Sequence, residues 1–376
     1  MSSLMEAFNA KALDLGVPLS AHLDVTYRCN ERCVHCYLDH DDHGEMTFAE
    51  IKDVLDQLAD AGVFFLTLSG GEVLMRMDFM DILKYARRLR FAVKVKTNGF
   101  MIRDKHAALF HRLGVQTVQI SIYSHRPEVH DAITKLPGSL KRSIAAIRLL
   151  KSHGVAVIIA NVLMRPNFND YTSVKELGKS LGVPVVTDPT ITPKMDGDRS
   201  LLGLGIHGPQ LGAAFHDTEL VGNVDEFCAV PSPADESVLD GIACSAGHTY
   251  CYISPYGDVY PCVQFPMPCG NVRSQKFLDI WRNSAQMNEV RSIRTRDLPT
   301  CSACTHAGTC TRCPGLAFME GNMRGPSSLD CEKSFARTGI PSANMINRQS
   351  LPVAVAIAGS ARGSVSGLVQ ISAARN

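Results

Sequence analysis

The 13 cysteines of this 376-residue chain are divided between two separate stretches. Three of them, Cys29, Cys33 and Cys36, lie close together near the N-terminus, and the other ten lie between positions 228 and 331. No cysteine occurs from residue 37 to residue 227. A disulfide framework spreads its cysteines through a short secreted chain, whereas a long cysteine-free stretch can build a core of its own. The distribution therefore predicts two metal-binding regions and a chain that stays in the cytosol.

The charge balance and the apolar pattern exclude other classes of protein. Lys and Arg number 38 against 37 Asp and Glu, so the formal charge is +1 and no strong field attracts nucleic acid or an anionic membrane. The apolar runs, such as residues 155–160, are far shorter than a membrane span. The first residues lack the basic and apolar regions of a secretory signal. We therefore expect a cytoplasmic protein with neither nucleic acid nor membrane as a partner.

The cysteine-free stretch contains short apolar segments that alternate with helical patterns. The first helix illustrates the pattern, because Thr47 and Glu50 form a capping box ahead of apolar residues at helical spacing. The segments predicted as strands are residues 20–26, 64–68, 92–96, 117–122, 155–163 and 183–187. Such alternation predicts an α/β fold with a parallel sheet and outer helices, either an open doubly wound sheet or a curved partial barrel.

Unusual residues follow the ends of the first four predicted strands. The first strand leads to the cysteine loop, the second to Gly70-Gly71-Glu72, the third to Asn98 and the fourth to Ser121. In both candidate folds, ligands bind at the carboxyl ends of the strands. We therefore expect one site assembled from these successive strand ends.

The spacing of the first three cysteines favours an iron-sulfur cluster. Three residues separate Cys29 from Cys33 and two separate Cys33 from Cys36. Three thiolates on one loop can hold three corners of a [4Fe–4S] cubane and leave one iron for an outside ligand. Structural zinc is the alternative, but it usually takes four protein ligands from paired C-x-x-C blocks.

The segment from Cys29 to Cys36 resembles the motif of the radical S-adenosylmethionine (SAM) superfamily, C-x-x-x-C-x-aromatic-C, with His35 in the aromatic position. The resemblance implies a partial (β/α)6 barrel in which Cys29, Cys33 and Cys36 hold the catalytic cluster and SAM binds at its open iron. It also implies that Gly70-Gly71-Glu72, which follows the second strand, binds the amino group of SAM. The glycines would allow close backbone approach, and the carboxylate would complement the ammonium group.

Two further residues are candidates for contacts with SAM. The same resemblance places Ser121, at the end of the fourth strand, against the ribose or the carboxylate of the cofactor. The alternative is a hydroxyl that caps a strand end. Asn98 is either a cofactor contact or a turn residue that tolerates a left-handed conformation.

The C-terminal cysteines resemble the SPASM extension of one branch of this superfamily. Its pattern begins with a cysteine, a glycine and a second cysteine, which here are Cys244, Gly257 and Cys262. A second block follows, made of Cys301, Cys304, Cys310, Cys313 and Cys331. The departure is that two residues rather than three separate Cys310 from Cys313. Residues 253–262 read as a hairpin. A pair of zinc ribbons is the alternative for this block.

The resemblance assigns the C-terminal cysteines to two auxiliary [4Fe–4S] clusters. An outer cluster would be held by Cys301, Cys304, Cys310 and Cys331. An inner cluster would be held by Cys244, Cys262 and Cys313, with a fourth ligand drawn from Cys228, Cys251 or Cys269. We favour Cys251, because strand alternation from a nearby turn could aim its side chain inward.

These observations predict the organisation of the whole chain. Residues 1–19 form an N-terminal extension, 20–194 the barrel, 195–240 a bridging segment and 241–337 the auxiliary-cluster domain. Residues 338–376 are rich in Ala, Ser and Gly, with little periodicity, and we expect a disordered tail.

The resemblance implies an oxidoreductase or maturase. Its reduced cluster would cleave SAM to methionine and a 5′-deoxyadenosyl radical, which abstracts a hydrogen atom from substrate. Most relatives in this branch modify ribosomally made peptides or protein side chains, with electrons from a donor such as flavodoxin or ferredoxin. Modification of tetrapyrrole side chains is the second hypothesis. A zinc-binding or redox regulatory protein without catalysis is the third.

Overall fold

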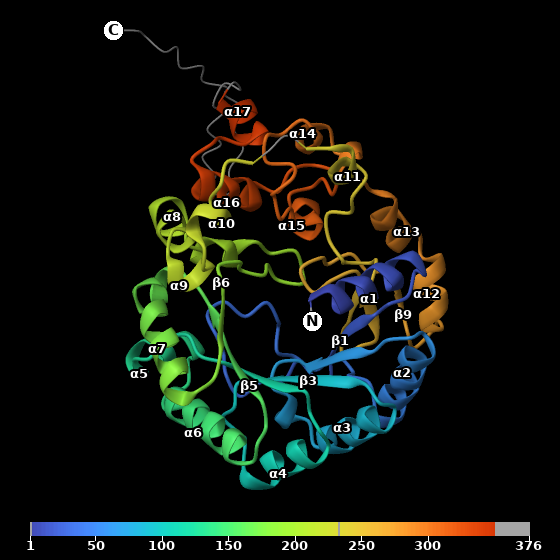
Figure 1. Cartoon of the computed structure of the whole chain (residues 1–376). Helices are drawn as coiled ribbons and strands as arrows, with labels where there is room; N and C mark the ends of the chain where they lie inside the picture. Colours follow the sequence, from blue (N-terminus) through green and yellow to red (C-terminus); the bar gives the residue numbers. More distant parts are fainter. Residues whose placement is uncertain (1, 232–233, 350–376) are drawn as a thin grey trace, which may run out of the picture.

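A computed structural model describes residues 2–231 and 234–349, in which a curved parallel sheet is wrapped by helices (Figure 1). Six parallel strands follow one another in space as they do in sequence, in the order β6-β5-β4-β3-β2-β1. Their bounds are β1 (Ser20–Asp24), β2 (Phe65–Ser69), β3 (Ala92–Thr97), β4 (Thr117–Ser121), β5 (Val157–Val162) and β6 (Val185–Asp188). The six strands predicted from the sequence are thus confirmed, and they form the curved partial barrel rather than the doubly wound sheet.

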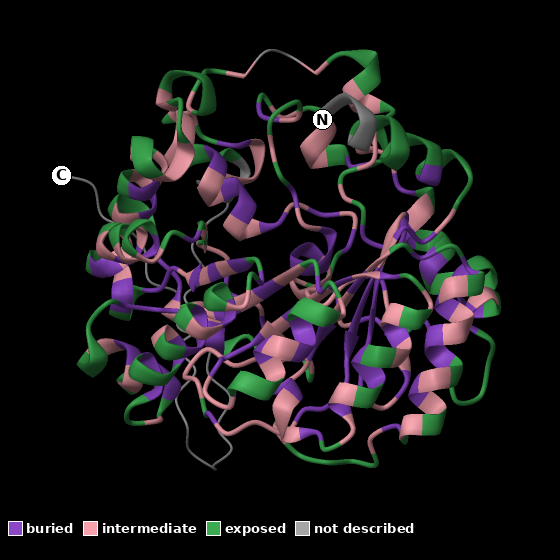
Figure 2. Cartoon of the chain, turned by 60° about the horizontal axis from the view of Figure 1, so that its bottom comes forward, coloured by how far each residue is buried: buried purple, intermediate pink, exposed green. Residues whose placement is uncertain are grey.

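Amphipathic helices connect these strands and cover the outer face of the sheet. They are α2 (Phe48–Asp60), α3 (Phe79–Arg88), α4 (Asp104–Arg112), α5 (Pro127–Thr134), α6 (Ser139–Ser152) and α7 (Tyr171–Leu181). The predicted capping box is present, since Thr47 and Glu50 bond reciprocally at the start of α2. Figure 2 shows these helices with buried faces toward the strands and exposed faces outward. The apolar residues that recur at helical spacing in the sequence form these buried faces.

The two faces of the strands differ in chemistry. One set of alternate residues, such as Leu23, Val93 and Val95, packs in the main hydrophobic core beneath the helices. Because successive side chains of a strand point to opposite faces, the other set, which includes Lys96 and Gln119, faces the interior of the barrel. That interior face is polar and borders the cavity described below.

The C-terminal cysteine-rich region adds strands to the same sheet. The strand β7 (Tyr250–Ile253) pairs parallel with β1, with Ala21 opposite Cys251. The strands β8 (Asp258–Tyr260) and β9 (Gly270–Asn271) continue antiparallel. The predicted hairpin is therefore confirmed. Its pairing with β1 was not predicted, because periodicity reports on a strand but not on its distant partner.

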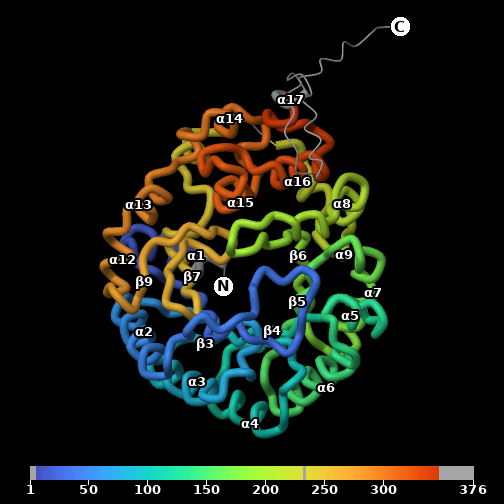
Figure 3. Tube along the Cα trace, turned by 180° about the vertical axis from the view of Figure 1, so that it is seen from behind, coloured from blue at the N-terminus to red at the C-terminus, as the bar shows by residue number. Residues whose placement is uncertain are grey.

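Short helices complete the described chain. The helix α1 (Ser2–Asp14) precedes β1, and α16 lies against α8 at the end of the barrel wall (Figure 3). The other elements are η1 (Val73–Met75), η2 (Arg165–Asp170), η3 (Ser200–Leu204), α8 (Gly208–Phe215), α9 (Thr218–Val221), α10 (Val224–Phe227), α11 (Glu236–Leu239), α12 (Phe277–Asn283), α13 (Ala285–Ser292), η4 (Thr295–Asp297), α14 (Pro299–Ser302), α15 (Pro314–Met319), α16 (Ser328–Thr338) and α17 (Ala343–Gln349). No helix among the described residues is long and apolar enough to cross a bilayer.

The first part of the predicted tail is folded. Residues 338–349 belong to the folded part, because α16 ends at Thr338 and α17 spans Ala343–Gln349. The backbone N–H of Ala343 lies 3.5 Å from the sulfur of Cys304, which ties this segment to the cysteine block. Residues 350–376, the rest of the predicted tail, lie outside the described residues.

Candidate functional site

The carboxyl ends of the barrel strands surround a cavity of about 330 Å³. The thiols predicted to hold the catalytic cluster line it together with candidates from three further strand ends. These residues are Cys29, Cys33, Cys36, Gly70, Gly71, Asn98 and Ser121. Of the candidates around this strand-end site, Glu72 does not line the cavity. The structure thus brings the residues that follow four separate strands into one place.

The cysteine loop is fixed at its start by Glu45. One carboxylate oxygen of Glu45 accepts hydrogen bonds from the hydroxyl of Thr26 at 2.6 Å and from the backbone N–H of Tyr27 at 2.9 Å. The other oxygen lies 3.3 Å from the guanidinium of Arg28. Further along, the N–H groups of Arg32 and Val34 donate to carbonyls at the end of α5. The loop is therefore held by backbone contacts on both sides of its first thiols.

Burial makes the three thiols keep their protons while no metal is bound. Burial raises the pKa of Cys29 to about 12 and that of Cys36 to about 11, and it also raises the pKa of Cys33. A buried thiolate is costly without a cation beside it. Iron replaces the proton and supplies the missing positive charge, so these free thiols fit an iron-sulfur cluster.

The two glycines after β2 lie against the cysteine loop. A Cβ atom on Gly70 would be 2.2 Å from the carbonyl oxygen of Thr26, and one on Gly71 would be 2.5 Å from the carbonyl oxygens of Tyr27 and Arg28. The N–H of Gly71 donates to the Thr26 carbonyl at 2.8 Å. The close approach that requires glycine here is therefore to the cysteine loop itself. Sequence reasoning had predicted approach to the ligand.

The carboxylate of Glu72 is fully buried and turned toward β3. It accepts hydrogen bonds from the hydroxyl of Thr97 and the N–H of Asn98, both at 2.8 Å, and from the N–H of Leu74 at 3.0 Å. Burial raises the pKa of Glu72, and these hydrogen bonds oppose the shift. The side-chain amide of Asn98 in turn donates to the side chain of Asn30 at 2.9 Å. Glu72 and Asn98 thus link the ends of β2 and β3 to the cysteine loop, and a contact with SAM stays a prediction.

Aromatic rings form one wall of the cavity. The imidazole of His35 packs edge-on against the ring of Tyr123, with 4.7 Å between the ring centroids. The ring of Tyr123 stacks on that of His130, with 5.4 Å between the centroids. The backbone N–H of Tyr123 donates to Nδ1 of His130 at 3.1 Å. His35 and Tyr123 both line the cavity. His35 therefore occupies its motif position as a packing ring.

The buried His130 predicts an acid-sensitive fold. Burial lowers its pKa from 6.5 to about 4, so the unfolded chain takes up a proton at this site before the folded chain does. The contribution of neutral His130 to the free energy of unfolding is complete above pH 6.5 and is lost as the pH falls toward 4. Between pH 7 and pH 5 this loss is about 2 kcal/mol. The variant His130→Gln keeps an acceptor but does not titrate. Urea unfolding of the apoprotein should show a smaller loss between these pH values for the variant. Equal losses in the two proteins would contradict the assignment.

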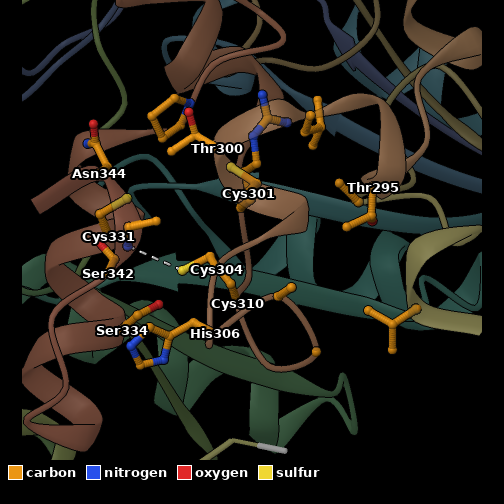
Figure 4. Close-up of a pocket in the computed structure, with 18 of the residues that line it drawn as sticks. Thr295, Thr300, Cys301, Cys304, His306, Cys310, Cys331, Ser334, Ser342 and Asn344 are labelled. Atoms are coloured by element: carbon orange, nitrogen blue, oxygen red, sulfur yellow. Dashed lines mark hydrogen bonds between the residues drawn. The ribbon is translucent and has the colours of Figure 1, made fainter. Parts of the chain in front are cut away.

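Four of the C-terminal cysteines line a second cavity of about 270 Å³. Figure 4 shows Cys331, from α16, on one side and Cys301, Cys304 and Cys310 on the other. Ser342 and Asn344, at the start of α17, also line this cavity. These four cysteines are the set predicted for the outer cluster.

The set predicted for the inner cluster is also brought together. Burial raises the pKa of Cys262 to about 12, and the negative charges of Cys244 and Cys313 add to the effect. The backbone N–H of Cys313 donates to Asp330 at 2.7 Å, which joins this site to α16. Cys244, Cys262 and Cys313 therefore lie within electrostatic reach of one another.

The structure argues against Cys251 as the fourth inner ligand. Its neighbours Tyr250 and Tyr252 point into the barrel, where they bond to His22 and Asp24. Strand alternation consequently turns Cys251 to the outer face, where it is fully buried in the hydrophobic core with Cys269. The prediction from the sequence used the same alternation but assumed that Cys251 belongs to the set of strand residues that points inward.

The third candidate, Cys228, lies at the end of α10 and donates to the carbonyl of Phe215.

Among the residues that the structure describes, no three His, Cys, Asp or Glu side chains converge tightly enough to hold a single metal ion.

Lys96 also lines the strand-end cavity but was missed from the sequence. A signal for Lys96 was present. The strand Ala92–Thr97 alternates valine and lysine, and charged residues on one face of a strand in a parallel barrel must point into its interior.

Comparison with known proteins agrees with this arrangement. Residues 23–176 match the family model of the Radical SAM superfamily, and residues 244–305 match SPASM, described as an iron-sulfur cluster-binding domain. The chain is 29% identical to the mycofactocin maturase MftC of Mycobacterium tuberculosis, over 82% of this chain and 81% of that protein. It is 27% identical to an AdoMet-dependent heme synthase of Methanosarcina barkeri, over 78% of this chain and 90% of that protein.

A solved structure shares the fold. SuiB of Streptococcus suis, bound to its precursor peptide SuiA, superposes with a TM-score of 0.68 at 17% identity, covering 87% of this chain and 79% of that one.

Proposed function

The chain belongs to the radical SAM superfamily and carries a SPASM domain, and from this premise we propose that it oxidises a side chain of a ribosomally made peptide. It is an enzyme whose cofactors are SAM, a [4Fe–4S] cluster and auxiliary iron-sulfur clusters. The observation that carries the proposal is a single cavity that gathers three cluster thiols and the strand-end residues, in a chain similar to a maturase.

The chain's own residues hold and orient the cofactors. When bound, the reduced cluster and SAM supply a 5′-deoxyadenosyl radical that abstracts a hydrogen atom from substrate. Cys29, Cys33 and Cys36 would hold this cluster, and the backbone around Gly70 and Gly71 sets the position of their loop. Buried side chains such as Tyr123 exclude water from the cavity, which protects a reactive species.

The C-terminal cysteines would hold the auxiliary clusters. Cys301, Cys304, Cys310 and Cys331 are proposed as the outer set, with Cys244, Cys262 and Cys313 as the inner set. The group held by the inner set would supply an electron acceptor for the oxidation. A flavodoxin or ferredoxin is proposed as the external donor to the catalytic cluster.

Isotope transfer tests the substrate class. Reconstituted enzyme would be incubated anaerobically with SAM, a reductant and deuterated peptides encoded beside its gene. Deuterium in 5′-deoxyadenosine and an oxidised peptide are expected. Modification of tetrapyrrole side chains is the second candidate, because a heme synthase is a relative of similar identity. Deuterium transfer from a labelled porphyrin, with none from any peptide, would reverse the assignment.

Iron counting tests the inner ligand set. The reconstituted chain should hold about twelve irons in three cubanes, and Cys262→Ala should lose about four of them. Cys251→Ala should lose none, because its side chain lies in the hydrophobic core. Iron and sulfide analysis after desalting measures both. If Cys251→Ala loses a cluster while Cys262→Ala keeps it, the proposed set is wrong.

A further inference from the structure

Lys96 places a positive charge inside the barrel. It lies on β3 between Val95 and Thr97, which are buried, and its side chain lines the cavity that contains the three N-terminal thiols. The neighbouring Val95 packs in the core beneath the helices. Alternation along the strand therefore turns Lys96 to the interior face.

No hydrogen bond or ion pair holds the ammonium group of Lys96 within residues 2–231 and 234–349. Asp24 and Asp188 are the carboxylates whose charges oppose its desolvation, and Asp188 also lines the cavity. Asp24 bonds to His22 at 3.0 Å and to the hydroxyl of Tyr252 at 2.9 Å. Asp188 accepts from the backbone N–H of Thr190 at 2.8 Å. A half-buried lysine without a paired anion is costly, so Lys96 itself is suited to an anionic ligand, although the carboxylates of Glu31 and Asp188 also line this cavity.

The position of Lys96 relates it to both cysteine regions. Burial lowers the pKa of Lys96, and the negative charges of Asp24, Cys262 and Asp188 oppose that shift. Cys262 belongs to the proposed inner set, whereas Cys29, Cys33 and Cys36 share the cavity with Lys96. Lys96 therefore lies in the cavity of the N-terminal thiols and within electrostatic reach of Cys262.

We propose that Lys96 binds a carboxylate of the substrate and so fixes the reacting group in the cavity of the three N-terminal thiols. The inference rests on the proposed function and adds to it that the substrate carries a carboxylate close to the carbon that is oxidised. A lysine ammonium is a compact charge with three donors, which suits a carboxylate in a half-buried site. The candidate contacts for SAM, Gly70, Gly71, Asn98 and Ser121, lie at or beyond the strand ends, whereas Lys96 lies one residue inside the end of β3.

Paired ligands that differ only in charge test this inference. The probes are N-acetyl amino acids and their matching carboxamides, offered to the reconstituted full chain with SAM present and no reductant. Ligand-observed NMR would measure binding to the wild type, Lys96→Met, Lys96→Arg and Lys94→Met. Lys94 is the matched control, because it lies on the same face of β3 but does not line the cavity.

We expect wild-type enzyme to bind acids in preference to amides. Lys96→Met should weaken acid binding about ten-fold or more, the size of a charge-assisted hydrogen bond, while Lys96→Arg keeps much of it and Lys94→Met keeps all of it. SAM affinity should be unchanged in every variant. Equal binding of acids and amides, no binding of either, or unchanged acid binding by Lys96→Met would overturn the proposal.

The SAM measurement separates the two sources of a carboxylate. A ten-fold loss of SAM affinity in Lys96→Met would show that Lys96 binds the cofactor's carboxylate, and the proposal for substrate would fail. The same preparations are then reduced and assayed for 5′-deoxyadenosine. If wild-type enzyme forms none, the radical function itself fails, whatever the NMR result.

Discussion

Replacement of Cys29, Cys33 and Cys36 by alanine together should abolish formation of 5′-deoxyadenosine. The three thiols share one cavity, and burial raises the pKa of Cys29 to about 12, so bound iron would replace the proton that such a thiol otherwise keeps. The variant should also lose about four of roughly twelve irons, because the proposed auxiliary ligands lie in a separate part of the chain. Anaerobic reconstitution, iron analysis and chromatography of the products measure both effects.

A cysteine outside the proposed sets provides the control. Cys251 lies in the hydrophobic core, and Cys251→Ala should retain both the iron content and the activity. If the triple variant still forms 5′-deoxyadenosine, the catalytic cluster lies elsewhere. If it loses all twelve irons, the N-terminal loop is also needed for the auxiliary domain to hold its clusters.

Gly70→Ala should destabilise the protein by about 3 kcal/mol or more. The residue has φ +148, and a Cβ would lie 2.2 Å from the carbonyl oxygen of Thr26. The new Cβ would meet backbone atoms of Thr26 rather than a flexible side chain, so the cysteine loop must move. Thermal unfolding of the reconstituted protein should show a lower midpoint, and the displaced loop should lower the occupancy of the catalytic cluster.

Gly203→Ala is the matched control for this substitution. Gly203 is not held at positive φ, and a Cβ there meets nothing within 4 Å. Its unfolding midpoint and iron content should match those of the wild type. A Gly70→Ala variant as stable as Gly203→Ala would mean that the loop after β2 can move away from the cysteine loop at no cost.

The barrel was predictable from the sequence because its determinants are local. Apolar segments of strand length alternate with amphipathic helices, and Thr47 with Glu50 marks a helix start that the structure reproduces. The pairing of β7 with β1 could not be predicted in this way. The pairing depends on which distant strand forms hydrogen bonds with the free edge of β1. The residues of β1 and β7 do not by themselves indicate that partner.

In the candidate site, too, the features set by local sequence were predictable and those set by distant residues were not. Cysteine spacing predicted which thiols gather around the cavity, since neighbours on one short loop must lie close together. The direction of Glu72 was not predictable, because it depends on the hydroxyl of Thr97 and the N–H of Asn98 on the next strand. Cys251 was assigned to the wrong face because alternation fixes relative directions along a strand but not which set points inward.

The pairing of β7 with β1 affects the order in which the chain can be assembled. Asp24, at the end of β1, bonds to Tyr252, which is 228 positions later. At ribosomal rates of about 5–20 residues per second, β1 would wait for its second neighbour on the order of ten seconds or more. Until then its free edge can template incorrect pairing, and barrel and cysteine-rich region cannot mature as independent units. Efficient production should therefore depend on protecting the nascent chain until translation of β7 is complete.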